Sequence, residues 1–269
     1  MTHSHPKPSP WTGYVDVDDT ALAVTDTGGG GPVVVYLNGA YSSQPAWRRV
    51  ITELGPEWRH ITYDERARGK SRRSADYSFD STVRDLEAVL AARRVQRPLL
   101  VGWSFGAGTA VHWAVRNPSR AGGLVLVDGG YPFDWIDDAA RDQTRRQFRK
   151  MRWALPVLAR FGMAARMTAD QHAEVNIEIN EVFGALGDQY DQLNCPTRFV
   201  VASGASMGGT GDEMAKMRAS LDPIVARRPN IRVGARVSSN HVTVLRKDYR
   251  AVAEVVGETA AAGRQRETS

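Results

Sequence analysis

Residues 99–116 read LLVGWSFGAGTAVHWAVR, and this stretch decides the fold. The apolar run Leu99–Val101 predicts a buried strand, and the small residues that follow the pentapeptide GWSFG predict a helix. Gly102 and Gly106 flank Ser104 between these two elements, so the chain can turn sharply and hold the Ser104 hydroxyl above the end of a sheet. A structural Gly/Ser turn is the alternative interpretation of the same five residues.

On both sides of this stretch, apolar strands alternate with helical segments. We expect an opening hairpin at 14–25, strands at 33–37, 59–63, 99–101, 124–127, 197–202 and 231–237, and helices at 46–54, 81–93, 107–115, 213–227 and 249–261. Continuous apolar strands separated by helices are typical of a parallel sheet that is buried on both faces. The prediction is an α/β fold: a mainly parallel, twisted sheet flanked by helices.

Residues 131–194 interrupt this alternation, because they contain helical candidates and no convincing strand. The candidate helices span 137–150, 152–161 and 170–183. The expected organisation is a disordered leader at 1–12, an α/β core at 13–130 and 195–262, a helical insertion at 131–194 and a polar tail at 263–269.

Composition excludes several classes of protein. The chain has 269 residues, of which 42% are hydrophobic and 24% charged, as in ordinary globular domains. Its one cysteine, Cys195, permits no intrachain disulfide, which suits a cytoplasmic protein. The formal charge is +5, but the arginines are scattered and lack interleaved aromatic residues, so nucleic acid is not an expected partner. Neither an export signal nor a membrane-spanning apolar run is recognisable, so no membrane association is expected.

A serine hydroxyl needs a base, a group that orients the base, and donors for the developing oxyanion. Among six histidines, His241 follows the last expected strand, in a loop at the carboxyl edge of the sheet where Ser104 also stands. The others lie in the leader, in an earlier strand, along the helix after Ser104 or in the insertion: His3, His5, His60, His112 and His172. His241 is the candidate base, and a surface-loop histidine is the alternative.

No cofactor loop or metal-ligand cluster is recognisable. The glycines Gly28–Gly31 precede a strand, whereas a dinucleotide fingerprint precedes a helix. Gly69-Lys70-Ser71 lacks the upstream glycine of a phosphate loop, because Asp64 occupies that position. We therefore expect a reaction that needs no cofactor.

From about Gly13 to Val256 the sequence resembles the α/β-hydrolase family. The resemblance rests on the pentapeptide around Ser104, on Asp64–Ser71 as the family's Asp-x-Arg-x-x-Gly-x-Ser loop, and on the order of serine before histidine. It implies that Ser104 is the nucleophile and that the insertion 131–194 is a helical cap over it.

The segment Leu37–Ala40 occupies the place of the family's His-Gly oxyanion segment. The resemblance assigns oxyanion donation to the backbone N–H groups of Ala40 and Phe105. Asn38 replaces the family's usual histidine, and we expect its amide to contact substrate. Tyr41 and Trp103, which adjoin these segments, are expected to line the pocket.

The acid of the triad is ambiguous in the sequence. In most relatives it lies three residues beyond a glycine after the strand that follows the cap, but here that residue is Met207, which cannot orient an imidazole. Asp212 or Glu213 could reach back along a longer loop. Asp128 ends the strand at 124–127 and resembles the acid position of haloalkane dehalogenases. We choose Asp128, with Asp212 second; a simple strand-end turn is the alternative for Asp128.

Together these residues predict a serine hydrolase that cleaves a carboxylic ester, lactone or thioester through an acyl-Ser104 intermediate, with an apolar acyl or ring group as the small-molecule substrate. A haloalkane dehalogenase is disfavoured because halide displacement needs a carboxylate nucleophile. Two alternatives use the same fold differently. One is a cyclase, acyltransferase or perhydrolase, and the other is a non-enzymatic receptor for a small molecule.

Overall fold

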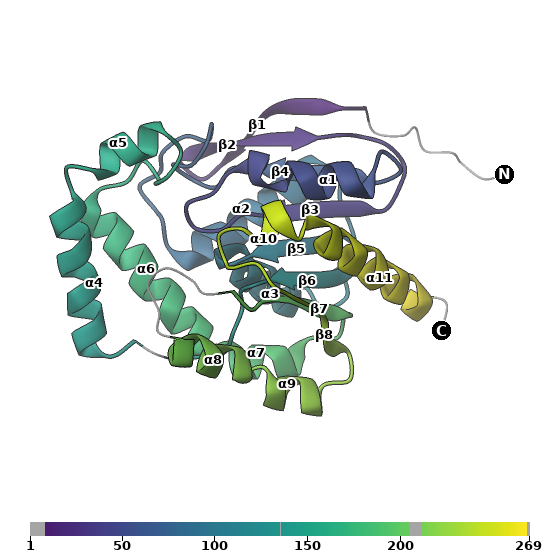
Figure 1. Cartoon of the computed structure of the whole chain (residues 1–269). Helices are drawn as coiled ribbons and strands as arrows, with labels where there is room; N and C mark the ends of the chain where they lie inside the picture. Colours follow the sequence, from purple (N-terminus) through teal and green to yellow (C-terminus); the bar gives the residue numbers. More distant parts are fainter. Residues whose placement is uncertain (1–8, 135, 205–210, 268–269) are drawn as a thin grey trace.

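The computed structural model describes residues 9–134, 136–204 and 211–267, without the side chains of 211–213 and 267. An eight-stranded sheet in the order β1-β2-β4-β3-β5-β6-β7-β8 runs through the molecule (Figure 1). Its strands are β1 Trp11–Val17, β2 Thr20–Asp26, β3 Val33–Leu37, β4 Arg59–Tyr63, β5 Leu99–Trp103, β6 Gly123–Val127, β7 Thr197–Ala202 and β8 Ile231–Val237. Strands β3 to β8 pair in parallel, whereas β2 pairs antiparallel with both β1 and β4. The predicted α/β fold is confirmed.

Each strand of the central sheet sends alternate side chains to opposite faces, and helices cover both faces. In β3, Val35 and Leu37 pack into one hydrophobic core, and Val34 and Tyr36 pack into the other. The first core is covered by α2 Phe79–Ala92 and α3 Phe105–Arg116. The second is covered by η1 Gln44–Trp47, α1 Arg48–Leu54, α10 Val244–Lys247 and α11 Tyr249–Glu267. The continuous apolar runs of the sequence exist because neither face meets water.

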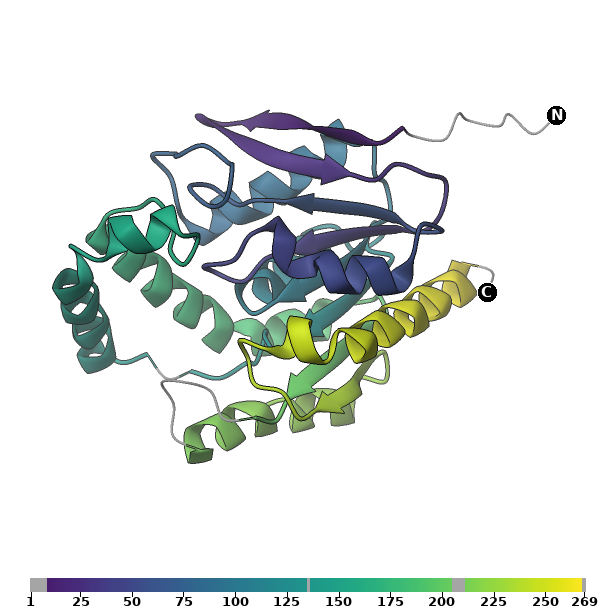
Figure 2. The same cartoon turned by 45° about the horizontal axis from the view of Figure 1, so that its top comes forward.

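The described residues between β6 and β7 form the helices α4 Asp138–Met151, α5 Leu155–Arg160, α6 Ala169–Gly184 and α7 Leu186–Gln192. In Figure 2, α4, α5 and α6 gather at one end of the molecule, beside the sheet rather than on its covered faces. Helix α4 buries none of its residues. Helix α6 is fastened at its end, where the Phe183 ring occupies the space beside Gly108 of α3.

The structure corrects several expected boundaries. Helix α11 continues to Glu267, so the residues predicted as a polar tail are helical up to that point, as their alanine, arginine and glutamine content allows. Strand β1 begins at Trp11, inside the expected leader.

The single helix expected at 213–227 is two helices, α8 Gly211–Ala219 and α9 Asp222–Arg227. The break precedes Pro223, which lacks an N–H and restricts the residue before it. Helix α7 was not expected from the sequence. No helix within the described ranges is long and apolar enough to cross a membrane.

Candidate active site

Ser104 stands between β5 and α3 in a backbone conformation that few residues adopt. Its φ is 54° and its ψ is −115°. The flanking glycines are required by space: a Cβ on Gly102 would lie 2.4 Å from the carbonyl oxygen of Gly106, and one on Gly106 would lie 2.3 Å from that of Leu37. The strand and the helix can therefore pack this closely only without side chains at 102 and 106, and the turn between them lifts Ser104 out of the sheet.

The neighbouring strand ends in a second tight turn. Asp128 follows β6 and has a φ of 41°. The next residue, Gly129, packs against the backbone of Ser104, where an added Cβ would lie 2.5 Å from the Ser104 carbonyl oxygen. The N–H of Ser104 also donates to the carbonyl of Val127 at 3.1 Å. The ends of the neighbouring strands β5 and β6 are thus tightly packed. Ser104 and Asp128 each follow the last paired residue of their strand, so they lie next to one another at the edge of the sheet.

The structure brings Ser104, His241 and Asp128 into one hydrogen-bonded chain. Ser104 Oγ lies 3.0 Å from His241 Nε2, and His241 Nδ1 lies 2.8 Å from Asp128 Oδ2. The Asp128 side chain is fully buried, whereas the His241 side chain is 33% exposed. These distances and this order match the geometry of an acid, a base and a nucleophile.

The second oxygen of Asp128 is occupied by two further donors. The N–H of Ala202 donates to Asp128 Oδ1 at 3.1 Å, and the Tyr131 hydroxyl donates to it at 2.7 Å. Burial and the Asp128 carboxylate raise the pKa of Tyr131 well above its ordinary value, so this phenol keeps the proton that it donates. Asp128 is therefore held in one orientation, with Oδ2 left for the imidazole. Sequence reasoning missed Tyr131 in this role.

Trp103 supports the loop that carries His241, the predicted base. Its indole N–H donates to the backbone carbonyl of His241 at 3.2 Å, and the two rings lie 5.7 Å apart. The contact shown for Trp103 is thus with His241, and its predicted contact with substrate remains a prediction.

The predicted oxyanion donors have no competing acceptor. Phe105 is the first residue of α3, whose opening N–H groups lack partners inside the helix. In the described part of the chain, neither the N–H of Phe105 nor that of Ala40 donates a hydrogen bond to another residue. Two backbone donors therefore remain available beside Ser104 and at the end of the β3 loop.

The prediction that the Asn38 amide contacts substrate is wrong in this structure. Asn38 is completely buried, and its Nδ2 donates to the carbonyl of Tyr63 at 2.7 Å and to Glu65 Oε2 at 3.0 Å. Its Oδ1 accepts a hydrogen bond from the Trp47 indole at 2.9 Å. Every polar atom of the amide is occupied below the oxyanion segment, so Asn38 braces that segment instead.

Tyr41 lies at the boundary between core and insertion, where it is 36% exposed. Its hydroxyl accepts a hydrogen bond from Asn176 Nδ2 of α6 at 2.6 Å, and its ring packs against that of His172 at 5.7 Å. The alternative acids Asp212 and Glu213 begin α8, but their side chains, like all of Met207, lie outside the described residues.

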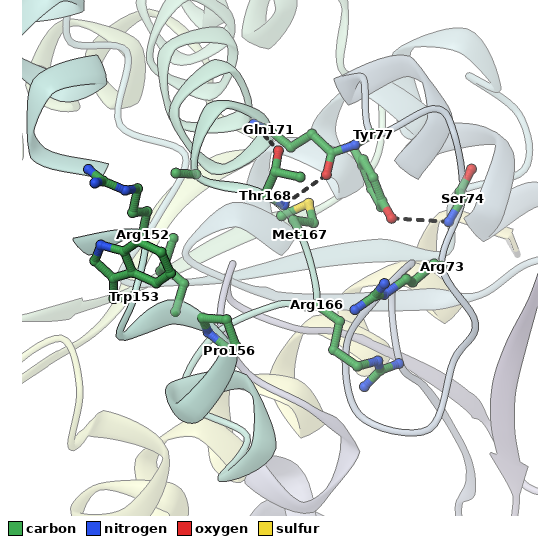
Figure 3. A pocket seen from close by; sticks show the side chains of 12 residues that line it. Arg73, Ser74, Tyr77, Arg152, Trp153, Pro156, Arg166, Met167, Thr168 and Gln171 are labelled. Carbon is green, nitrogen blue, oxygen red and sulfur yellow. Dashed lines mark hydrogen bonds between the residues drawn. The ribbon is translucent and has the colours of Figure 1, made fainter. Parts of the chain in front are cut away.

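A separate surface pocket of about 540 Å³ opens between the loop 73–77 and the insertion (Figure 3). Its lining comprises Arg73, Ser74, Tyr77, Arg152, Trp153, Leu155, Pro156, Arg166, Met167, Thr168, Ala169 and Gln171. None of Ser104, His241 and Asp128 belongs to it, so this pocket is distinct from the candidate active site. Within the described residues, no group of three or more His, Cys, Asp or Glu side chains is arranged to hold a metal ion.

Comparison with known proteins agrees with this architecture. The profile of the α/β-hydrolase fold family matches residues 32–197, more than half of the chain. The chain therefore belongs to the α/β-hydrolase fold family.

Individual relatives extend the comparison. A haloalkane dehalogenase of Mesorhizobium japonicum is 33% identical over 146 residues, which are 54% of this chain and 47% of that protein. The 2-succinyl-6-hydroxy-2,4-cyclohexadiene-1-carboxylate synthase of Serratia proteamaculans is 31% identical over 114 residues, which are 42% of this chain and 44% of that protein. The chain thus spans less than half the length of these relatives. A thermophilic esterase of Thermogutta terrifontis superposes with a TM-score of 0.70 over 93% of this chain and 97% of its own, at 19% identity, and so shares the fold.

Proposed function

We propose that the protein is a cofactor-independent serine hydrolase that cleaves a carboxylic ester, lactone or thioester through an acyl-Ser104 intermediate. The observation that carries the proposal is the continuous chain of hydrogen bonds from Ser104 Oγ through His241 to Asp128. This arrangement occurs at the carboxyl edge of a parallel sheet, where folds of this class hold their reacting groups.

In the first half of the reaction, His241 Nε2 takes the Ser104 proton while Oγ attacks the substrate carbonyl carbon. The negative charge that forms on the carbonyl oxygen is held by the N–H groups of Ala40 and Phe105. The C–O or C–S bond to the leaving group then breaks, and the His241 imidazolium protonates that group.

In the second half, His241 removes a proton from water, and the resulting hydroxide attacks the acyl-Ser104 carbonyl. Collapse of this intermediate returns the proton to Ser104 and releases the acid. Throughout, Asp128 orients the imidazole and stabilises its positive form. Because Asp128 Oδ1 is already held by Ala202 and Tyr131, the carboxylate enters the reaction preorganised.

We further propose that the helices of 131–194 act as a cap that closes over Ser104. The hydrogen bond between Tyr41 and Asn176 joins this insertion to the loop that follows the oxyanion segment. Dehalogenation is not proposed, although one relative is a haloalkane dehalogenase, because the residue at 104 is a serine and halide displacement needs a carboxylate nucleophile.

The test is hydrolysis of 4-nitrophenyl esters of graded acyl length, together with lactones and thioesters. The wild-type protein is expected to hydrolyse substrates of this kind to the carboxylic acid, and Ser104→Ala is expected to lose this activity by several orders of magnitude. Turnover that persists in Ser104→Ala would refute the acyl-serine mechanism.

A non-hydrolytic reaction on the same fold is the second candidate, favoured by the similarity to a synthase of Serratia proteamaculans. Product analysis separates the two candidates. Hydrolysis incorporates one oxygen atom from ¹⁸O-labelled water into the acid product, whereas a cyclisation or elimination incorporates none.

A further inference from the structure

Arg68 is a buried cation that lacks a carboxylate partner. It is 5% exposed, and in the described part of the chain it makes no ion pair. Other buried arginines differ: Arg59 pairs with Asp26 at 2.7 Å, and Arg66 pairs with Asp85 at 2.7 Å. The partners of the Arg68 guanidinium are neutral groups: two backbone carbonyls and the Phe105 ring, whose centroid lies 5.7 Å from Cζ. A buried cation without a counter-charge is costly, so an anion that arrives from outside would stabilise it.

The pKa directions agree with this contrast. Despite burial, hydrogen bonds to Asp85 and Asp18 raise the pKa of Arg66. Burial lowers the pKa of Arg68. The carboxyl group that acts most strongly on Arg68 is Glu65, which is itself buried, and burial raises the pKa of Glu65 to about 7. Glu65 is therefore a weak counter-charge near neutral pH.

One nitrogen of Arg68 remains free for a ligand. Nε donates to the carbonyl of Ala40, and Nη1 donates to the carbonyl of Arg66 at 3.1 Å. Among the described residues Nη2 has no hydrogen-bond partner, and it is not sealed from solvent. Arg68 Nε donates a hydrogen bond to the carbonyl of Ala40. The free Nη2 of the same guanidinium therefore lies near Ala40, the residue whose N–H is proposed to hold the oxyanion.

A second free donor is carried by Tyr41, the residue that follows Ala40 in the chain. The Tyr41 hydroxyl accepts a hydrogen bond from Asn176 at 2.6 Å but donates none to a described residue, so its own proton is available. The Tyr41 ring is fixed against His172, whose ring stacks on that of Phe148 at 5.5 Å. Arg68 and Tyr41 are linked through Ala40, because Arg68 Nε donates to the Ala40 carbonyl and Tyr41 is the next residue.

We propose that Arg68 and Tyr41 form a subsite that binds a carboxylate of the substrate close to the scissile carbonyl. The natural substrate would then be an ester, lactone or thioester that carries a second, ionised carboxyl group. Two donors match the two oxygens of a carboxylate, whereas a phosphate would leave a further charged oxygen without a donor among these residues. This inference rests on the proposed hydrolase function and refines the apolar pocket expected from the sequence.

The experiment compares the release of 4-nitrophenol from mono-4-nitrophenyl glutarate and from its methyl ester, in which a methyl group removes the negative charge of the distal carboxyl group. The wild-type kcat/KM is expected to favour the anionic substrate by about tenfold or more, mainly through KM, because hydrogen bonds to charged groups are strong. Arg68→Gln is expected to remove most of this preference, and Arg68→Lys to restore part of it. Tyr41→Phe is expected to reduce the preference severalfold.

Arg73→Gln is the matched control. Arg73 lines the separate surface pocket of Figure 3, and its removal should leave the preference unchanged. If Arg68→Gln lowers both kcat/KM values by the same factor, Arg68 only clamps Ala40 and the inference is wrong. If Arg68→Gln does not fold, Tyr41→Phe decides, and an unchanged preference in Tyr41→Phe overturns the proposal.

Labelling of Ser104 by a fluorophosphonate separates this inference from the function on which it rests. A wild-type protein that is labelled but shows no preference for the glutarate contradicts the carboxylate subsite alone. A wild-type protein that is not labelled contradicts the proposed hydrolase function. Competitive inhibition by free glutarate, weakened in Arg68→Gln and unchanged in Arg73→Gln, would support the subsite independently.

Discussion

The carboxyl edge of the sheet and the helical insertion are built under opposite constraints. At the edge, Ser104 and Asp128 both have positive φ, and Gly106 and Gly129 leave no space for a side chain. In the insertion, α4 buries no residue at all. The proposed catalytic groups are therefore held by a tightly packed backbone, whereas the sequence of α4 can vary without disturbing a buried core.

The largest effect should come from Asp128, the proposed acid at the carboxyl edge of the sheet. Asp128→Asn is expected to lower kcat by about 10⁴-fold, because the amide cannot hold the imidazole in the required tautomer or stabilise its cation. Asp212→Asn, which changes the other aspartate considered from the sequence, is expected to change kcat by less than about threefold. Steady-state kinetics on one ester measures both, and the reverse ranking would assign the acid to α8.

The two candidate acids, Asp128 and Asp212, also show which features of the site can be predicted from the sequence. The turn at Ser104 is predictable because glycine sterics and strand-to-helix order act within a few residues. The choice between Asp128 and Asp212 depends on which carboxylate reaches His241 through space, and spacing along the chain does not encode that distance.

Asn38 was misjudged for the same reason. Its position in the oxyanion segment suggested a contact with substrate, but Glu65 and Trp47 take up its amide. The end of α11 was misjudged in another way, because a polar terminal sequence of good helix formers was interpreted as a tail.

The second largest effect should come from adding a side chain at Gly106, at the carboxyl edge of the sheet. Gly106→Ala would put a Cβ 2.3 Å from the Leu37 carbonyl oxygen and is expected to cost about 3 kcal/mol or more, or to prevent folding. Gly257→Ala, in the middle of α11 with no atom within 4 Å of the added Cβ, should instead stabilise the protein by up to about 1 kcal/mol. Urea unfolding measures the change in the free energy of unfolding for both variants. Equal changes would contradict the difference in packing between Gly106 and Gly257.

A third effect concerns pH, through Glu65 beneath the oxyanion segment. Burial raises the pKa of Glu65 from 4.5 to about 7, so between these values the folded state binds more protons than the unfolded state. The contribution of Glu65 to stability is fully present below about pH 4.5 and is lost as pH rises through 7, at a cost of up to about 3 kcal/mol.

Glu65→Gln, which cannot ionise, should flatten this dependence of the unfolding free energy. Glu254→Gln, at an exposed position of α11, should leave it unchanged. An identical slope in wild type and Glu65→Gln would show that Glu65 does not titrate in this range.

The smallest effect should come from the junction of insertion and core. Arg166 donates to the carbonyls of Gly69 and Ser71, the first at 2.7 Å, and its own N–H donates to Ala67 at 2.8 Å. Arg166→Ala removes the two side-chain bonds and is expected to cost about 1–2 kcal/mol in urea unfolding. Arg160→Ala, which changes an exposed arginine of α5, should cost less than about 0.5 kcal/mol. A similar loss of unfolding free energy in the two variants would mean that the side-chain hydrogen bonds of Arg166 do not stabilise the protein.

The reactivity of Ser104 tests the central claim most directly. Folded protein is treated with a fluorophosphonate, and the labelled peptide is identified by mass spectrometry. The account predicts that one phosphonyl group is attached to Ser104. Labelling should fail when the protein is unfolded before treatment, and the rate of labelling should fall at least 100-fold in His241→Ala. No label on Ser104, or labelling at the same rate without His241, would contradict the account.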